Sequence, residues 1–291
     1  MVILKDILRK AMKEGWSTGH FNVSELDHVR AIIEVCSEMG APAIIGISEG
    51  ERSHIGLTQL TALRNAFRQD FPAVPIFLNA DHTKSVDNTK KAVDAGFDSV
   101  HIDLSAKSFD ENVSGTKEIV AYTRAKDPDI SVEGELGYLK GESKVQHEKI
   151  AISADDYTKP EEAKRFVEET GVDRLAIVVG NIHGISLEEP DLDIERIYAI
   201  REIIPEETAI VLHAGSGIPD DQIKAAIKAG IANIHINTDL RVAYTDGLRR
   251  SFEAHPDEVA MYKLDIFAFD ALKAVLKEKL SLFDSVNRTR I

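Results

Sequence analysis

The chain has a single cysteine, few aromatic residues and no surplus of positive charge. Because Cys36 stands alone, an intramolecular disulfide and a zinc site built from several thiolates are excluded. It lies in the helical pattern AIIEVCSEMG, which predicts a buried structural thiol. The 49 acidic residues outnumber the 35 lysines and arginines, which gives a formal charge of −14. With no local basic patch, a nucleic-acid partner is not expected.

Long apolar runs are also absent. No apolar stretch reaches the roughly 20 residues needed to cross a bilayer, and the first residues lack a signal-peptide pattern. We therefore expect a cytoplasmic protein with no membrane partner. The acidic surplus would weakly repel a phosphorylated substrate, so a phosphate site would have to be built from local donors.

Short apolar segments alternate with amphipathic ones along the chain, and 43% apolar residues are ample for a core. The expected strands lie near residues 18–23, 42–48, 74–80, 98–103, 130–136, 173–180, 208–213 and 231–237. The expected helices lie near residues 25–39, 58–69, 85–95, 110–125, 160–170, 191–203, 219–229, 239–253 and 257–280. This alternation predicts right-handed βαβ units and a parallel sheet. Eight strands, with no G-x-G-x-x-G after the first, favour one α/β domain over residues 1–291, a (β/α)₈ TIM barrel with extra C-terminal helices.

The longest interruption of this pattern is the segment 137–158, GYLKGESKVQHEKIAISADDYT. It is polar and contains glycine. Loops of this length in compact domains are usually functional lids or disordered segments. The sequence therefore predicts a mobile active-site loop here.

Five expected strands end in residues that a metal enzyme needs. They read NADHT (79–83), HIDLS (101–105), VEGELG (132–137), VVGNIHG (178–184) and VLHAGSG (211–217). In a parallel barrel all strands open at their carboxyl ends onto one face, where active sites form. Side chains that are distant in sequence are therefore expected to meet there.

Three histidines stand at or just past strand ends: His82, His183 and His213. Catalytic zinc commonly takes three protein ligands and leaves one position open. Any one of these histidines could be structural, but three at equivalent positions predict a zinc site. Asp81 precedes His82, where it could move a proton beside a metal-bound substrate. Its alternative role is to orient a ligand or to cap a helix.

Further polar groups stand at the same strands. Asp103, Glu133 and Glu135 add carboxylates, and the two glutamates share one strand face that is expected to point inward. An interior salt-bridge layer is the alternative interpretation of these glutamates. His101 and His235 lie within strands, so we expect them to form a buried polar layer below the metal rather than to ligate it.

Glycines follow two of the candidate ligands, and phosphate is commonly bound by backbone N–H groups and glycine-rich turns. The loops after strands seven and eight are the usual phosphate site of this barrel. A plain glycine turn is the alternative. The candidate phosphate-binding residues are Gly184, Gly215, Ser216, Gly217, Asn237, Thr238 and Asp239.

Together these segments resemble the class II, metal-dependent fructose-bisphosphate aldolase family, including its tagatose-bisphosphate branch. The resemblance is carried by FNV at 21–23, Ser48 and Gly50, DHTKS at 81–85, VEGELG, NIHG, LHAGSG and NTDLR at 237–241. It implies zinc held by His82, His183 and His213, and proton transfer by Asp81. It also implies an alternative, more buried metal position at Asp103 and Glu135.

The resemblance also implies ligands and partners beyond the zinc site. Asn22 and Ser48 would join the substrate-binding residues, and Glu142 would be the loop carboxylate that handles the second proton. Arg241 matches a position that can bind a distal phosphate. Family members often bind Na⁺ or K⁺ beside the phosphate, and they form dimers or tetramers.

Several positions depart from the family pattern. His235 stands where the family usually has the Asn that contacts the dihydroxyacetone moiety, and Asn233 stands where Lys is common. Asn237 replaces the Asp of fructose-type and the Ala of tagatose-type members, and Ala214 replaces a common Gly. Ser143 replaces the second residue of an acidic pair. The sequence therefore predicts the metal ligands more clearly than it predicts which sugar is the substrate.

The sequence thus predicts a zinc-dependent aldolase that cleaves a ketose bisphosphate to dihydroxyacetone phosphate and an aldehyde phosphate. Arg241 favours fructose 1,6-bisphosphate as the substrate. Alternatives are tagatose 1,6-bisphosphate, a deoxy-keto acid phosphate, and a non-catalytic barrel that binds metal and sugar phosphate. Asp81 favours catalysis, because binding alone needs no proton shuttle, whereas His235 and Ser143 favour the non-catalytic alternative.

Overall fold

Eight parallel strands close into a barrel in the order β1-β10-β9-β7-β5-β4-β3-β2. The computed structural model describes residues 2–146, 150–186 and 190–289. The strands are β1 Thr18–Asn22, β2 Ala43–Ile47, β3 Ile76–Thr83, β4 Ser99–Ile102, β5 Ser131–Leu136, β7 Arg174–Ile177, β9 Ala209–Leu212 and β10 Ile231–Ile236. The expected TIM barrel is confirmed. Its apolar side chains form one large core cluster that joins strands to helices.

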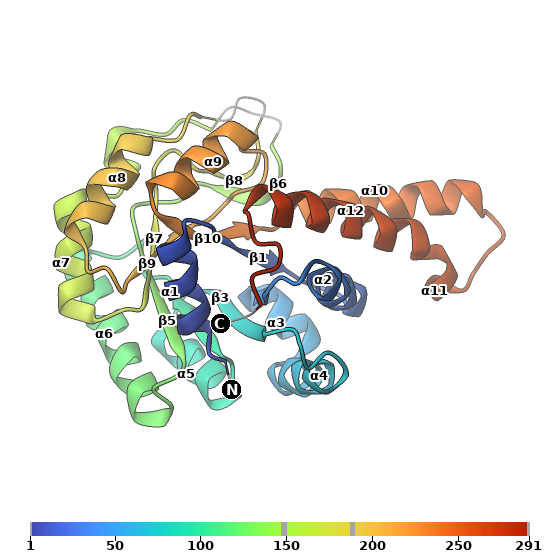
Figure 1. Cartoon of the computed structure of the whole chain (residues 1–291), viewed down its shortest axis with the longest axis horizontal. Coiled ribbons are helices and arrows are strands. Elements are labelled where there is room, and N and C mark those ends of the chain that lie inside the picture. The colour runs from blue at the N-terminus through green and yellow to red at the C-terminus, as the bar shows by residue number, and fades with distance from the viewer. Residues whose placement is uncertain (1, 147–149, 187–189, 290–291) are drawn as a thin grey trace.

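Helices surround the barrel (Figure 1). The predicted helices between strands are α2 Leu26–Met39, α4 Leu57–Asp70, α5 Val86–Asp94, α6 Phe109–Lys126, α7 Pro160–Thr170, α8 Ile194–Ile203 and α9 Asp220–Ala229. Each lies within a few residues of its expected range. No helix in the described part of the chain is long and apolar enough to span a membrane.

The last helices form an arm that extends from the barrel (Figure 1). Helices α10 (Thr238–Ala254) and α12 (Ile266–Leu282) pack against each other along this arm. The expectation of one helix over 257–280 is wrong at its start, where the short α11 (Met261–Leu264) precedes α12. Pro256 disfavours helical backbone at the preceding residue, which explains why α10 ends where it does.

Two helices were not predicted from the sequence. Helix α1 (Leu4–Glu14) buries its apolar stripe in a second core cluster with Trp16, Ile44 and Phe77. It thereby covers the amino-terminal end of the barrel. Helix α3 (Glu49–Ile55) follows β2 and begins with a capping box between Ser48 and Glu51.

The segment predicted as a mobile loop contributes a strand. β6 (Gly141–Val145) pairs in parallel with β8 (His183–Ile185), and a 3₁₀ turn follows at Ala154–Asp156. Residues 147–149 lie outside the described part of the chain, and the mobility of the segment stays a prediction. This small sheet brings His183 next to the segment that carries Glu142.

Candidate active site

An irregularity in β3 brings Asp81 and His82 into one site. The register between β3 and β4 shifts between Ala80 and Thr83, so the intervening residues form a bulge. His82 has a φ of 39°, in the left-handed region that a non-glycine residue seldom adopts. Consecutive side chains of a regular strand point to opposite faces. The bulge therefore lets both residues line the same cavity.

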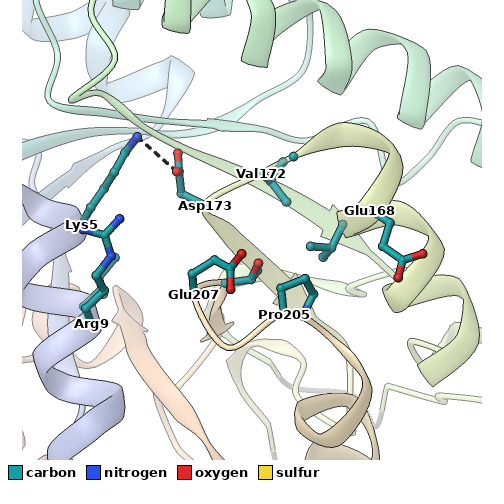
Figure 2. A pocket seen from close by; sticks show the side chains of 11 residues that line it. Lys5, Arg9, Glu168, Val172, Asp173, Pro205 and Glu207 are labelled. Carbon is teal, nitrogen blue, oxygen red and sulfur yellow. Dashed lines mark ion pairs between the residues drawn. The ribbon is translucent and has the colours of Figure 1, made fainter.

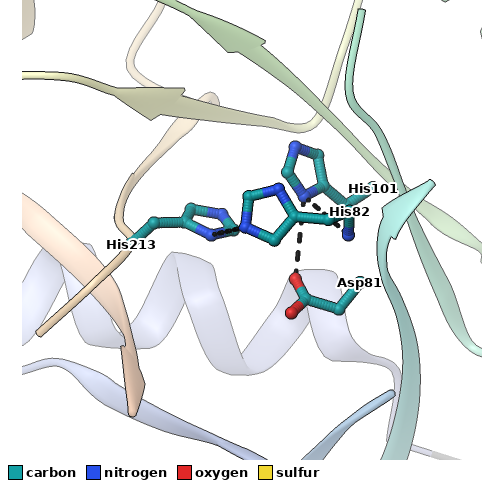
Figure 3. A group of neighbouring side chains, drawn as sticks. All are labelled: Asp81, His82, His101 and His213. Carbon is teal, nitrogen blue, oxygen red and sulfur yellow. Dashed lines mark hydrogen bonds and ion pairs between the residues drawn. The ribbon is translucent and has the colours of Figure 1, made fainter. Parts of the chain in front are cut away.

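Asp81, His82, His101 and His213 form a compact group (Figure 3), with ligand atoms all within 4.8 Å of one another. His213 Nδ1 lies 3.0 Å from His82 Nε2. The ring centroids of His82 and His183 lie 5.0 Å apart, so the third predicted ligand borders the group. The structure thus brings together the three histidines that the sequence singled out and adds His101 to them.

Buried carboxylates fix two of these rings. His82 Nδ1 lies 2.7 Å from Asp103 Oδ2, and His213 Nε2 lies 2.6 Å from Glu133 Oε1. In both pairs the imidazole N–H donates to the carboxylate. The other nitrogen of each ring is the one that faces the neighbouring histidine. In metal-binding histidines the N–H of the ring nitrogen that does not bind the metal usually donates a hydrogen bond, often to a carboxylate.

A second group of possible ligands shares His82 and His101 with the first. His82, His101, Asp103 and Glu135 also offer atoms within 4.8 Å of one another. The carboxylates of Asp103 and Glu135 are 3% and 2% exposed, respectively. Asp103 and Glu135 are the two residues to which the family resemblance assigns the alternative metal position.

The donors fit a zinc ion. Neutral imidazole and carboxylate are both common zinc ligands. Asp81 Oδ1, His101 Nε2 and Glu135 Oε2 are buried and make no hydrogen bond among the described residues, although His101 Nε2 lies 3.3 Å from Glu135 Oε2. Burial, with the nearby charge of His82, lowers the pKa of His183 to about 3. Its imidazole is therefore neutral at neutral pH, and one ring nitrogen keeps a lone pair for a metal. Such a cluster of under-satisfied buried groups is what a bound cation would complete.

Asp81 is held as a carboxylate. Burial opposes its ionisation, but the charge of His82 and the nearby imidazoles of His101 and His235, which lie 3.7 and 3.4 Å from Oδ1, outweigh burial and lower the pKa of Asp81. Asn22 Nδ2 also donates to Asp81 Oδ2 at 3.0 Å. An ionised, oriented carboxylate at the cavity wall can accept a proton from a substrate hydroxyl.

His235 does more than fill a layer below the site. Its ring stacks on His20 at 3.5 Å between centroids, and Nδ1 lies 3.4 Å from Asp81 Oδ1. It also lines the cavity, next to His213. His235 therefore contacts both a predicted ligand and the predicted proton-transfer residue.

The mouth of the barrel encloses a cavity of about 340 Å³. It is lined by Asn22, Ser48, Asp81, His82, Lys84, Glu142, Ser143, His183, Gly184, His213, Ala214, Ser216, His235, Asn237, Thr238 and Arg241. Among the predicted site residues, Asp103, Glu135, Gly215, Gly217 and Asp239 do not line it directly.

Except for Gly184, which lies in β8, the predicted phosphate-binding residues lie between β9 and the start of α10. The backbone N–H of Asp239 donates to Ser216 Oγ at 3.1 Å, and that of Gly215 donates to the carbonyl of His235 at 2.9 Å. Gly217 has a φ of 83° and supports the turn. Thr238 begins α10, whose N-terminus favours an anion at this side of the cavity.

Arg241 forms an ion pair and a hydrogen bond with other residues of the protein. Its Nη2 lies 2.8 Å from Glu51 Oε1, and its Nη1 donates to the carbonyl of Ser143 at 3.1 Å. Glu142, the predicted second proton-transfer residue, is largely exposed and lies 2.6 Å from Lys144. Arg241 thus bridges α3, β6 and α10 at the rim of the cavity.

Another cavity, of about 300 Å³, lies beside α1 and the segments that enter β7 and β9 (Figure 2). Its Lys5 is paired with Asp173 at 3.1 Å. It lacks histidines and opens at the amino-terminal ends of the strands, where barrel residues usually serve stability. The mouth cavity is therefore the candidate active site.

Comparisons with known proteins show what the whole chain is similar to. The sequence profile of the family described as fructose-bisphosphate aldolase class-II matches residues 2–288. The crystal structure of the YdjI aldolase from Escherichia coli K12 is 29% identical, with a TM-score of 0.82, and the match covers 99% of each chain. A candidate fructose-1,6-biphosphate aldolase from Coccidioides immitis is 25% identical, with a TM-score of 0.85, covering 98% of this chain and 97% of that one.

A third solved structure supports the fold alone. Fructose-bisphosphate aldolase from Campylobacter jejuni is 20% identical, with a TM-score of 0.79, and the match covers 98% of this chain and 95% of that one.

Sequence reasoning did not identify Glu51, Lys84 or Arg174. Lys84 follows the DHT motif and pairs with Asp103, so the motif itself was a signal. Glu51 stands three residues after Ser48, the spacing of a capping box, which could have located α3. Arg174 carried no such signal, because a charged residue at the start of a strand is usually exposed.

Proposed function

The chain belongs to the class II fructose-bisphosphate aldolase family, and from this membership we propose that it is a zinc-dependent aldolase. It would reversibly cleave a phosphorylated ketose to dihydroxyacetone phosphate and an aldehyde. The observation that carries the proposal is the convergence of His82, His183 and His213 around Asp81 in one cavity. Binding alone would not need an ionised carboxylate beside the ligand set.

His82, His183 and His213 would hold the metal, with Asp103 and Glu135 forming an alternative position. When bound, zinc supplies Lewis acidity that polarises the substrate ketone. Asp103 and Glu133 orient the imidazoles through their hydrogen bonds. No Schiff-base lysine is then required.

Asp81 would take the proton of the C4 hydroxyl during cleavage and return it during condensation. Asn22 keeps one of its oxygens in place for this step. Glu142, on β6, would handle the proton on the dihydroxyacetone phosphate carbon, and its exposure leaves it free to turn inward. This division gives the two proton transfers to two different carboxylates.

The phosphate on C1, which stays with dihydroxyacetone phosphate, would bind to Gly184, Gly215, Ser216, Gly217, Asn237, Thr238 and Asp239. Na⁺ or K⁺ would bind beside it. Fructose 1,6-bisphosphate is the substrate that the sequence resemblance favours. Tagatose 1,6-bisphosphate, another ketose phosphate or a deoxy-keto acid phosphate are the alternatives. We also propose a homodimer or homotetramer, as the family resemblance suggests.

A cleavage assay on the zinc-loaded protein tests the proposal. Dihydroxyacetone phosphate is measured with fructose and tagatose 1,6-bisphosphates and with the corresponding 1-phosphates. Formation of dihydroxyacetone phosphate that stops on chelation supports the proposal. Tight binding of these compounds without any cleavage, and without condensation in the reverse direction, would favour the non-catalytic alternative.

A further inference from the structure

Both positively charged side chains that line the mouth cavity, within the described residues, are already paired with a carboxylate. Lys84 pairs with Asp103, and Arg241 lies 2.8 Å from Glu51. Lys144, beside the cavity on β6, lies 2.6 Å from Glu142. A second phosphate on a substrate would therefore find each of these cations next to a competing negative charge.

Glu51 is fixed in its place beside Arg241. Its side chain is 6% exposed. Its Oε2 accepts the backbone N–H of Ser48 at 2.7 Å and the amide of Asn22 at 3.3 Å. These contacts anchor one carboxylate oxygen within the capping box of α3, so the other remains directed at Arg241. A substrate phosphate could displace Glu51 from Arg241 only by breaking these contacts too.

The two ends of a ketose would meet different surroundings. One end has the N-terminus of α10 at Thr238 and the hydroxyl of Ser216, which line the cavity and suit a phosphate. Another part of the lining comes from Asn22 and Ser48, at the ends of β1 and β2, next to the Glu51–Arg241 pair. The carbon chain beyond the cleaved bond would extend toward this pair.

We propose that Glu51 makes this protein select a ketose 1-phosphate whose far end is an uncharged, polyhydroxylated chain. The proposal rests on the proposed aldolase function and specifies its substrate class. Hydroxyl groups can accept from the Arg241 guanidinium, which lines the cavity, without disturbing its pairing with the Glu51 carboxylate. A distal phosphate can accept from Arg241 but is repelled by Glu51, and this repulsion is strong in a partly buried site.

The test compares matched substrates that differ only in the distal phosphate: fructose 1-phosphate against fructose 1,6-bisphosphate, and the same pair of tagatose. The wild type is expected to show a kcat/KM for the 1-phosphate roughly tenfold or more above that for the bisphosphate. Glu51→Gln is expected to shrink this ratio about tenfold, because glutamine keeps the helix cap but not the charge.

Glu49→Gln is the matched control, since it removes the same charge from the same helix at a carboxylate that accepts from Asn88 rather than from Arg241. It is expected to leave the ratio unchanged. A wild type that prefers the bisphosphates overturns the proposal while leaving the aldolase function intact. An unchanged ratio in Glu51→Gln also overturns it.

Condensation provides a second measurement that needs no variant. Dihydroxyacetone phosphate is offered with D-glyceraldehyde or with D-glyceraldehyde 3-phosphate, and the uncharged aldehyde is expected to react with the higher kcat/KM. A preference for the phosphorylated aldehyde contradicts the proposal. Failure to cleave any of the four ketose phosphates or to condense either aldehyde would overturn the selectivity, but not an aldolase function directed at another phosphorylated substrate.

Discussion

Arg174 Nη1 lies 2.7 Å from Glu133 Oε2 in the centre of the barrel, and both side chains are fully buried. Glu133 also holds His213 through its other oxygen. Position 233 is commonly Lys in the family, and here Arg174 Nη1 donates to Asn233 Oδ1 at 3.3 Å. Arg174 on β7 thus places its positive charge beside position 233 on β10, where other family members commonly have the positive charge of Lys.

Arg174→Met is expected to lower the free energy of unfolding by about 3–5 kcal/mol, because it leaves the buried Glu133 charge without its partner. Urea denaturation measures the loss. Arg165→Met, at an exposed ion pair with Glu169, is the control and is expected to cost about 1 kcal/mol or less.

The double variant Arg174→Met/Asn233→Lys is expected to recover part of the lost stability, since it returns a cation to the neighbouring strand. A loss below about 1 kcal/mol in Arg174→Met would contradict a strong dependence of the barrel on this pair.

Ala214 is a site of backbone strain next to a predicted ligand. Its φ is 57°, in the region that favours glycine. Ala214→Gly is therefore expected to raise the free energy of unfolding by up to about 1 kcal/mol, visible as a higher melting temperature. A lower melting temperature would mean that the methyl group contributes more than the strain costs.

His28 links stability to pH. It is 3% exposed and accepts the backbone N–H of Ser24 at Nδ1, and burial lowers its pKa to about 4. Between pH 6.5 and 4 the unfolded chain takes up a proton that the folded protein excludes. Stability should therefore fall with falling pH across this window, by about 3 kcal/mol from this residue alone.

His28→Gln removes this titration, and Gln can still accept the Ser24 N–H. Its free energy of unfolding should fall less than that of the wild type between pH 7 and 4.5. Identical pH dependence in both proteins would mean that His28 stays accessible to protons when folded.

The sequence was sufficient for the barrel because its strands are short, strongly apolar and regularly spaced between amphipathic helices. The helix α1 was also recoverable, since Leu4, Ile7, Leu8 and Ala11 follow helical spacing. The pairing of β6 with β8 was not, because its exposed residues lack the alternating apolar pattern. Such a pair is stabilised by contacts between residues that are distant in sequence.

The sequence predicted the site only as far as one rule allows, which is that the carboxyl ends of parallel barrel strands meet on one face. That rule brought His82, His183 and His213 together, but it treated His101 as a separate layer. The bulge at Asp81 and His82 changes which side chains face inward, and no pattern in a single sequence predicts such a bulge. The pairing of Arg241 with Glu51 depends likewise on how α3 and α10 pack at the rim.

Asp81→Ala separates proton transfer from metal binding. The variant should retain zinc, because His82, His183 and His213 remain. Its turnover should fall by roughly 10²–10⁴-fold, the range for loss of a general acid–base group. Steady-state cleavage together with metal analysis measures both properties. Near-normal turnover would mean that the C4 hydroxyl proton goes to another group.

Metal content tests the central claim most directly. Zinc is measured in purified wild type, His82→Ala, His183→Ala and His213→Ala, with His54→Ala as a control on an exposed histidine. About one tightly held divalent ion per chain is expected in the wild type and control. Substantial loss of the ion is expected in the other three. Full metal retention in all three variants would contradict the assignment of these histidines as ligands.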